Sequence, residues 1–151
     1  MKTINEITQE IITEFNAFPT VDEKYAHLFA VGEELPKMDA RLKSDANKVQ
    51  GCQSDLWFDL KYEDGRFMLQ TDSDSLVIKG IAGLLVRIVE NCPPAEVQQL
   101  NLDFVDRLNI WKLASERNNG LMAMLKYVKQ QAEQALEGDM SKSYENGGDH
   151  A

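Results

Sequence analysis

The sequence has 151 residues, of which 43% are hydrophobic, and its formal net charge is -9 at pH 7. This length suffices for one domain with its own core, and we expect a single domain over residues 1–137. The negative charge repels phosphate backbones and anionic lipid, which argues against binding to nucleic acid or to a membrane surface. No apolar run approaches the roughly 20 residues that cross a bilayer, and acidic residues interrupt the N-terminus where a signal peptide is apolar. The sequence therefore predicts a cytoplasmic protein.

The chain has two cysteines, Cys52 and Cys92, which are too few for a disulfide framework and indicate free thiols in a reducing compartment. It also has two histidines, His27 and His150, and neither lies at a spacing typical of a zinc site. The sequence thus predicts no resident metal ion.

Two amphipathic helices are predicted near the N-terminus. Thr3 and Glu6 have the spacing of a capping box, and apolar residues then recur on one helical face as far as the Phe18-Pro19 break. Thr20 begins a second helix, for which we expect Gly32 to be the C-terminal stop.

A β-hairpin is predicted next. Residues 48–50 are expected to form a short strand that leads into a loop around Cys52. Residues 56–62 and 67–71 are rich in strand-forming residues, and Glu63-Asp64-Gly65 between them is a turn signal. The cysteine loop is therefore expected at the entrance of the hairpin.

The most apolar stretch, residues 76–89, is predicted to be a central buried helix with its N-caps in Asp72-Ser73-Asp74-Ser75. Gly80 and Gly83 lower its helix propensity, so we expect them to allow close packing against a neighbouring element. Residues 95–100 and 104–108 are expected to form short helices, and the apolar pattern over residues 121–132 predicts a C-terminal helix. Residues 138–151 are predicted to be a disordered tail.

Cys52 stands between a glycine and two polar residues, a layout that presents one sulfur atom on a tight loop. Such a thiol acts as a nucleophile or a sulfur carrier when its thiolate is populated and can reach a partner. On position alone, a packing thiol is the competing interpretation, because most cysteines are packing residues.

Several sequence blocks occur together in a fixed order. They are Glu33-Glu34-Leu35-Pro36, Asn47-Lys48-Val49-Gln50-Gly51-Cys52-Gln53-Ser54 with Trp57, Asp72-Ser73-Asp74, Lys79-Gly80, and Ser115-Glu116-Arg117-Asn118-Asn119-Gly120-Leu121. By these blocks the chain resembles the SufE family, over about residues 15–129. The resemblance implies an α+β fold, in which a small antiparallel β-sheet packs with N-terminal and C-terminal helices, similar to IscU-type scaffolds. This chain lacks the three cysteines with which those scaffolds assemble clusters.

The resemblance also implies a function. A SufE-like protein takes persulfide sulfur from a cysteine desulfurase (SufS-like, dependent on pyridoxal phosphate, PLP), stimulates that enzyme, and passes the sulfur to an iron–sulfur cluster scaffold (SufB-like complex). Cys52 fills the position of the persulfide carrier, surrounded by the loop residues Gly51, Gln53 and Ser54. Arg117 fills the family's Ser-x-Arg position and is our candidate for an auxiliary cation. The resemblance implies a sulfur-transfer accessory protein rather than a stand-alone enzyme, with no cofactor of its own.

Two other functions remain open. A thiol-dependent redox enzyme would use Cys52 with Cys92 as the resolving thiol, although the chain lacks a Cys-x-x-Cys motif. A cluster scaffold would bind iron directly, which so few thiols and histidines do not favour. For the remaining residues we favour simpler interpretations: helix caps for Asp72 and Asp74, solvated edges for Lys79 and Arg87, and packing for Cys92, Trp57, Phe58, Met122 and Met124.

Overall fold

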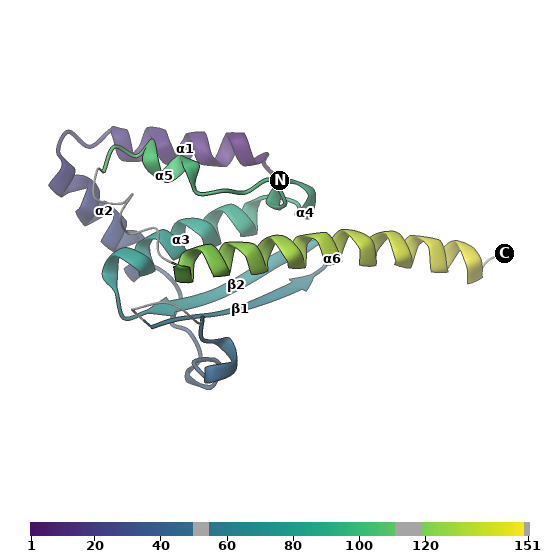
Figure 1. Cartoon of the computed structure of the whole chain (residues 1–151). Coiled ribbons are helices and arrows are strands. Elements are labelled where there is room, and N and C mark those ends of the chain that lie inside the picture. The colour runs from purple at the N-terminus through teal and green to yellow at the C-terminus, as the bar shows by residue number, and fades with distance from the viewer. Residues whose placement is uncertain (50–54, 111–118, 150–151) are drawn as a thin grey trace.

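The computed structural model describes residues 1–49, 55–110 and 119–149 and shows an α+β fold (Figure 1). Its helices and strands are α1 (Ile4–Asn16), α2 (Val21–Glu33), the 3-10 turns η1 (Ala40–Leu42) and η2 (Asp45–Asn47), β1 (Leu56–Glu63), β2 (Arg66–Ser73), α3 (Leu76–Asn91), α4 (Pro94–Val97), α5 (Asp103–Asp106) and α6 (Asn119–Asp149). The helix α3 lies between α1 and the hairpin formed by β1 and β2, and α6 runs along the hairpin (Figure 1). None of the helices that the structure describes is long and apolar enough to cross a membrane.

The first two helices begin where the sequence predicts. Thr3 Oγ1 accepts the backbone N–H of Glu6 at 3.1 Å, and the Glu6 carboxylate accepts the backbone N–H of Thr3 at 3.3 Å. Thr20 Oγ1 accepts the N–H of Glu23 at 3.1 Å. The stop predicted at Gly32 is wrong, because α2 continues to Glu33. A Cβ atom at Gly32 would lie 3.1 Å from the backbone nitrogen of Gly80, so this glycine allows a helix contact instead.

The helix α3 is buried along most of its length, as predicted. A Cβ atom at Gly80 would lie 2.6 Å from the carbonyl oxygen of Leu28, and one at Gly83 would lie 2.9 Å from Cγ1 of Val31. Real Cβ atoms do not approach other atoms this closely. Both glycines therefore let α2 pack directly against the backbone of α3, which confirms the expected close packing.

The hairpin has the predicted turn. Asp64 and Gly65 have φ values of 54° and 77°, and they form the two-residue connection that antiparallel strands favour. Lys48 adds a single β-bridge to Trp57 rather than a full strand, and Gln50, the last residue of the strand predicted over 48–50, lies outside the described residues.

The C-terminal part differs from the prediction in detail. The short helices predicted over 95–100 and 104–108 are single turns at α4 and α5. The backbone of α6 stays helical to Asp149, where the sequence favours disorder from residue 138. Its C-terminal half extends past the rest of the protein (Figure 1), and apart from the adjacent residues and backbone of the helix itself, no atom lies within 4 Å of the Cβ position of Gly138. Met124 is fully buried as predicted, but Met122 is 48% exposed and is not a core residue.

Candidate functional site

The predicted loop residues Gly51, Cys52, Gln53 and Ser54 and the predicted auxiliary residue Arg117 lie outside the described residues. The candidate site is therefore defined by the residues on either side of these two segments. Val49 and Asp55 flank the cysteine loop, and α6 begins directly after the segment that contains Arg117.

The two chain segments that flank the cysteine loop are joined to each other. The backbone N–H of Val49 donates to the carbonyl oxygen of Leu56 at 2.8 Å. Lys48 Nζ lies 2.8 Å from Asp55 Oδ1, and the Asp55 carboxylate raises the pKa of the Lys48 ammonium group. The chain therefore enters and leaves the loop at one place, which we call the loop base (Lys48, Val49, Asp55 and Leu56).

Asp74 ties the loop base to the start of α3. Its carboxylate accepts the backbone N–H of Asp55 at 2.9 Å, and its own N–H donates to the Asp55 carbonyl oxygen at 3.3 Å. The hydroxyl of Ser73 donates to the same carbonyl oxygen at 2.6 Å. The N-cap of α3 is Ser75, so the prediction that Asp74 caps this helix is wrong, because its carboxylate is already used by Asp55.

Asp72 forms an ionic cluster beside the loop base and is not a helix cap either. Its carboxylate lies 2.9 Å from Lys43 Nζ and 3.3 Å from Lys79 Nζ, so Lys79 is not the solvated edge that we expected. Burial raises the pKa of Asp72, but hydrogen bonds from Lys43, the Ser73 N–H and Lys79 lower it below its ordinary value. Lys43 Nζ also lies 4.7 Å from the ring centroid of Trp57, at cation–π distance. The cluster joins the η1–η2 connection, β2 and α3 around one carboxylate.

A cavity of about 280 Å³ adjoins the loop base. It is lined by Val49, by Phe58 and Leu60 of β1, and by Ala123 and Tyr127 of α6. The rings of Phe58 and Tyr127 meet edge to face, with centroids 5.1 Å apart. The cavity thus lies between the segment before Cys52 and the start of the helix that follows Arg117, and its lining combines apolar side chains with the polar residues Asn47, Lys48 and Asp59.

Cys92 does not belong to this site. It is the C-cap of α3, its side chain is fully buried, and burial together with the charges of Glu96 and Glu6 raises its pKa to about 11. A thiol with this pKa carries almost no thiolate at neutral pH, so Cys92 is a packing residue, as predicted.

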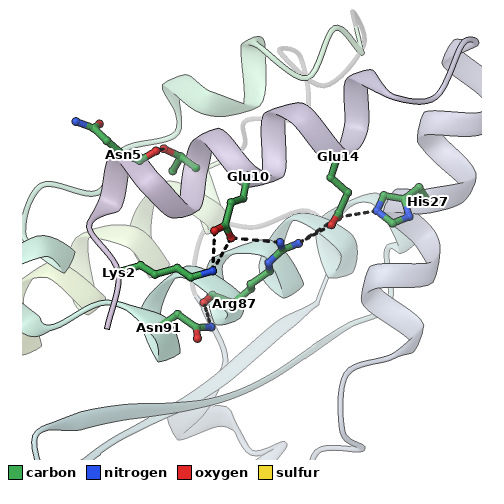
Figure 2. Close-up of polar contacts among 8 residues, drawn as sticks. Lys2, Asn5, Glu10, Glu14, His27, Arg87 and Asn91 are labelled. Atoms are coloured by element: carbon green, nitrogen blue, oxygen red, sulfur yellow. Dashed lines mark hydrogen bonds and ion pairs between the residues drawn. The ribbon is translucent and has the colours of Figure 1, made fainter.

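A second polar cluster lies on the other side of α3 and was missed by the sequence analysis (Figure 2). The guanidinium group of Arg87 donates to both carboxylate oxygens of Glu14 at 3.1 Å, and His27 Nε2 lies 2.8 Å from the same carboxylate. Lys2 and Glu10 pair beside them at 2.7 Å. Arg87 is therefore not the solvated edge that we expected. The cluster joins α1, α2 and α3, and its partners are too far apart in the chain for a sequence pattern to reveal them.

Among the side chains that the structure describes, within residues 1–49, 55–110 and 120–138, no group of three potential metal ligands occurs. What the described residues offer is a fixed loop base beside a cavity with both apolar and polar lining residues.

Comparison with known proteins identifies the class of protein to which this site belongs. Residues 9–132 match the model of the SufE family, described as an Fe-S metabolism associated domain, and the chain belongs to this family. The SufE-like protein 1, chloroplastic/mitochondrial, of Arabidopsis thaliana is 35% identical over 82% of this chain, but the match covers 34% of the length of that protein. An uncharacterized SufE-like protein of Synechocystis is 32% identical over 82% of this chain and 78% of its own length.

A solved structure shows the same fold. The solution structure of a hypothetical protein from Thermus thermophilus superposes with a TM-score of 0.69 and covers 87% of this chain and 96% of that protein, at 19% identity. This likeness supports the α+β fold, and the family assignment places the chain in iron–sulfur metabolism.

Proposed function

We propose that this protein is a sulfur carrier that accepts persulfide sulfur on Cys52 from a PLP-dependent cysteine desulfurase of the SufS type. It then delivers the sulfur to an iron–sulfur scaffold such as a SufB-like complex. The observation that carries the proposal is the family match over residues 9–132, which includes the Gly51-Cys52-Gln53-Ser54 block. A cytoplasmic location is part of the same proposal, and the two cysteines, too few for a disulfide framework, support a reducing compartment.

The transfer is a relative of thiol–disulfide exchange. The Cys52 thiolate attacks the outer sulfur of the donor persulfide, the sulfur–sulfur bond of the donor breaks, and its electron pair leaves with the donor thiolate. A new sulfur–sulfur bond remains on Cys52, with no net oxidation or reduction. The proton lost by Cys52 balances the proton gained by the donor thiolate, so the step needs no cofactor on this protein.

The geometry around the loop supports such a carrier. The Lys48–Asp55 ion pair and the Asp74–Asp55 hydrogen bonds hold together the two chain segments that flank Cys52, which supports a fixed attachment for a carrier loop. The neighbouring cavity is lined by Lys48 and Val49, which precede the cysteine segment, and by Ala123 and Tyr127 of the helix that follows Arg117.

The buried thiol of Cys92 weighs against the alternative of a redox enzyme. A resolving cysteine must attack as a thiolate, and burial holds the pKa of Cys92 at about 11. The scaffold alternative is not favoured by the composition, since the chain has only two cysteines and two histidines.

The test is mass spectrometry of the intact protein after incubation with a SufS-type desulfurase and cysteine. The expected result is a gain of one sulfur atom that dithiothreitol removes, present in the wild type and in Cys92→Ser and absent in Cys52→Ser. Desulfurase turnover should rise with the wild type and with Cys92→Ser but not with Cys52→Ser. Sulfur found on Cys92, or on neither cysteine, would overturn the proposal.

A further inference from the structure

Lys43 is part of the ionic cluster beside the loop base, although it belongs to none of the sequence blocks that carry the family resemblance. Its ammonium group lies 2.9 Å from Asp72 Oδ2 and 4.7 Å from the centroid of the Trp57 ring. Asp72 and Trp57 are register partners in the hairpin, so Lys43 binds two side chains that stand opposite each other on β1 and β2. Lys43 itself lies between η1 and η2, outside the sheet. This one side chain therefore joins the η1–η2 connection to the hairpin.

Two other groups orient the Asp72 carboxylate. Its Oδ1 atom accepts the backbone N–H of Ser73 at 2.8 Å and lies 3.3 Å from Lys79 Nζ. These contacts leave Oδ2 for Lys43, and the side chain of Asp72 is 21% exposed. A carboxylate that is already oriented loses little side-chain entropy when it binds a lysine, and this loss is what weakens most surface ion pairs. The Lys43–Asp72 contact is therefore better defined than an ordinary surface pair.

The chain between Lys43 and the loop base is internally hydrogen-bonded. Asn47 Nδ2 donates to the carbonyl oxygen of Leu42 at 2.8 Å. The backbone N–H of Lys48 donates to the carbonyl oxygen of Asp45 at 3.3 Å, and Lys48 is the first residue of the loop base. These residues thus form one compact unit that moves as a whole, with Lys43 near its start and the loop base at its end.

Polar contacts hold this unit on the protein. No residue from Asp39 to Lys48 is buried, and neither η1 nor η2 contributes a core side chain. Apolar packing therefore contributes little to the position of the unit, and the contacts of Lys43 contribute correspondingly more.

We propose that Lys43 is a positioning residue for sulfur transfer: it holds residues 42–48 on the hairpin and thereby fixes the N-terminal entry to the cysteine segment. The inference rests on the proposed function, because this entry matters for transfer only if Cys52 carries the sulfur. Without the ammonium group, the unit is held at the loop base alone and takes up a range of positions. Small displacements lower a transfer rate strongly even when they arise away from the reacting atoms. Loss of Lys43 should therefore slow the transfer more than it weakens the binding of the partner.

The first test uses the protein without a partner and does not depend on the proposed function. The N–H of Val49 donates across the loop base to Leu56, so its hydrogen exchange in nuclear magnetic resonance reports the opening of that base. In Lys43→Met, which keeps an unbranched side chain but loses the charge, this exchange should be about fivefold faster. Exchange at Ile81 in the buried part of α3 should not change. Unchanged exchange at Val49, or equal acceleration at both amides, would overturn the proposal.

The conservative variant and a matched control follow the same signal. Lys43→Arg should restore the exchange rate of Val49, because a guanidinium group both pairs with a carboxylate and stacks on an aromatic ring. Lys2→Met removes the same charge and breaks the ion pair with Glu10, 2.7 Å long, on the other side of α3, and should leave Val49 unchanged. Failure of arginine to restore the rate, or an equal effect of Lys2→Met, would refute the assigned contacts.

A double-mutant cycle tests whether Lys43 acts through Asp72. Asp72→Asn should accelerate the exchange of Val49 at least as much as Lys43→Met. The variant with both substitutions should exchange no faster than Asp72→Asn alone, because the two side chains form one contact. Multiplied effects in the double variant would show that Lys43 acts independently of Asp72 and would contradict the proposal.

The transfer itself is tested by mass spectrometry with an excess of a SufS-type desulfurase that already carries its persulfide. At saturating desulfurase, Lys43→Met should gain sulfur about tenfold more slowly than the wild type, and Lys43→Arg should restore the rate. The desulfurase concentration that gives half of the maximal rate should stay within about twofold of the wild-type value.

The outcomes of this assay separate the two proposals. An unchanged maximal rate in Lys43→Met would refute the positioning role, and a higher half-saturating concentration without a slower maximal rate would assign Lys43 to direct contact with the desulfurase instead. If the wild type accepts no sulfur, the proposed function fails and the positioning role fails with it. The exchange measurements would in that case still establish what Lys43 contributes to the loop base.

Discussion

Cys92 is expected to be almost inert toward alkylating reagents in the folded protein. Burial is the main cause that raises its pKa from 9.0 to about 11, with smaller contributions from Glu96 and Glu6. This rise lowers the fraction of thiolate at pH 8 about 100-fold. The side chain is also 0% exposed, so a reagent must wait for a local opening of the C-terminal end of α3.

The assay is a time course with iodoacetamide at pH 8, followed by peptide mass mapping of Cys92. We expect alkylation at least about 100-fold slower in the native protein than in the same protein unfolded in urea, where the thiol has its ordinary pKa. The Cys52→Ser variant provides the control, because it removes any disulfide with the second cysteine and should leave the rate at Cys92 unchanged.

A native rate within about tenfold of the unfolded rate, with circular dichroism showing an intact fold, would refute the argument from burial. Cys92 would then be available as a resolving thiol, and the redox alternative would regain support. A slow rate at Cys92 leaves Cys52 as the single thiol available for sulfur transfer.

Two further predictions concern the helix packing and its pH dependence. Gly80→Ala gains about 1 kcal/mol of helix propensity but places a Cβ atom 2.6 Å from a backbone oxygen, an overpacking that costs about 3 kcal/mol. Urea unfolding should therefore show a net loss of about 2 kcal/mol, with Gly138→Ala as the uncrowded control, and equal stabilities would contradict this packing. Burial raises the pKa of the Glu14 carboxyl group, but His27 and Arg87 lower this pKa below 4.5. The ionised Glu14 carboxylate therefore contributes fully to the stability of the fold above about pH 4.5, and this contribution is lost as the pH falls through the pKa of Glu14 in the folded protein. Glu14→Gln should lower the free energy of unfolding by at most about 1 kcal/mol at pH 7, because this carboxylate is about a third exposed. The variant should also lose less stability than the wild type below about pH 4.5. Parallel curves of unfolding free energy against pH for the two proteins would refute this prediction.

The sequence by itself determined the features that depend on nearby residues. The capping box of Thr3 and Glu6 and the Asp64-Gly65 turn involve partners within three residues, so their patterns are visible in the chain. The apolar run of α3 and the SufE motif blocks are visible for the same reason. The close packing at Gly80 could also be predicted from the sequence, because glycine lowers helix propensity and its presence inside a helix indicates close contact with a neighbouring element.

The tertiary structure decided which polar groups meet. The Asp74 carboxylate binds the Asp55 N–H, 19 positions away, and the Arg87 guanidinium binds Glu14, 73 positions away. Before folding, each of these side chains has several equally suitable partners, and local patterns favoured caps and solvated edges. The sequence thus determined the elements and the family, and long-range packing determined the loop base and the ionic clusters around α3.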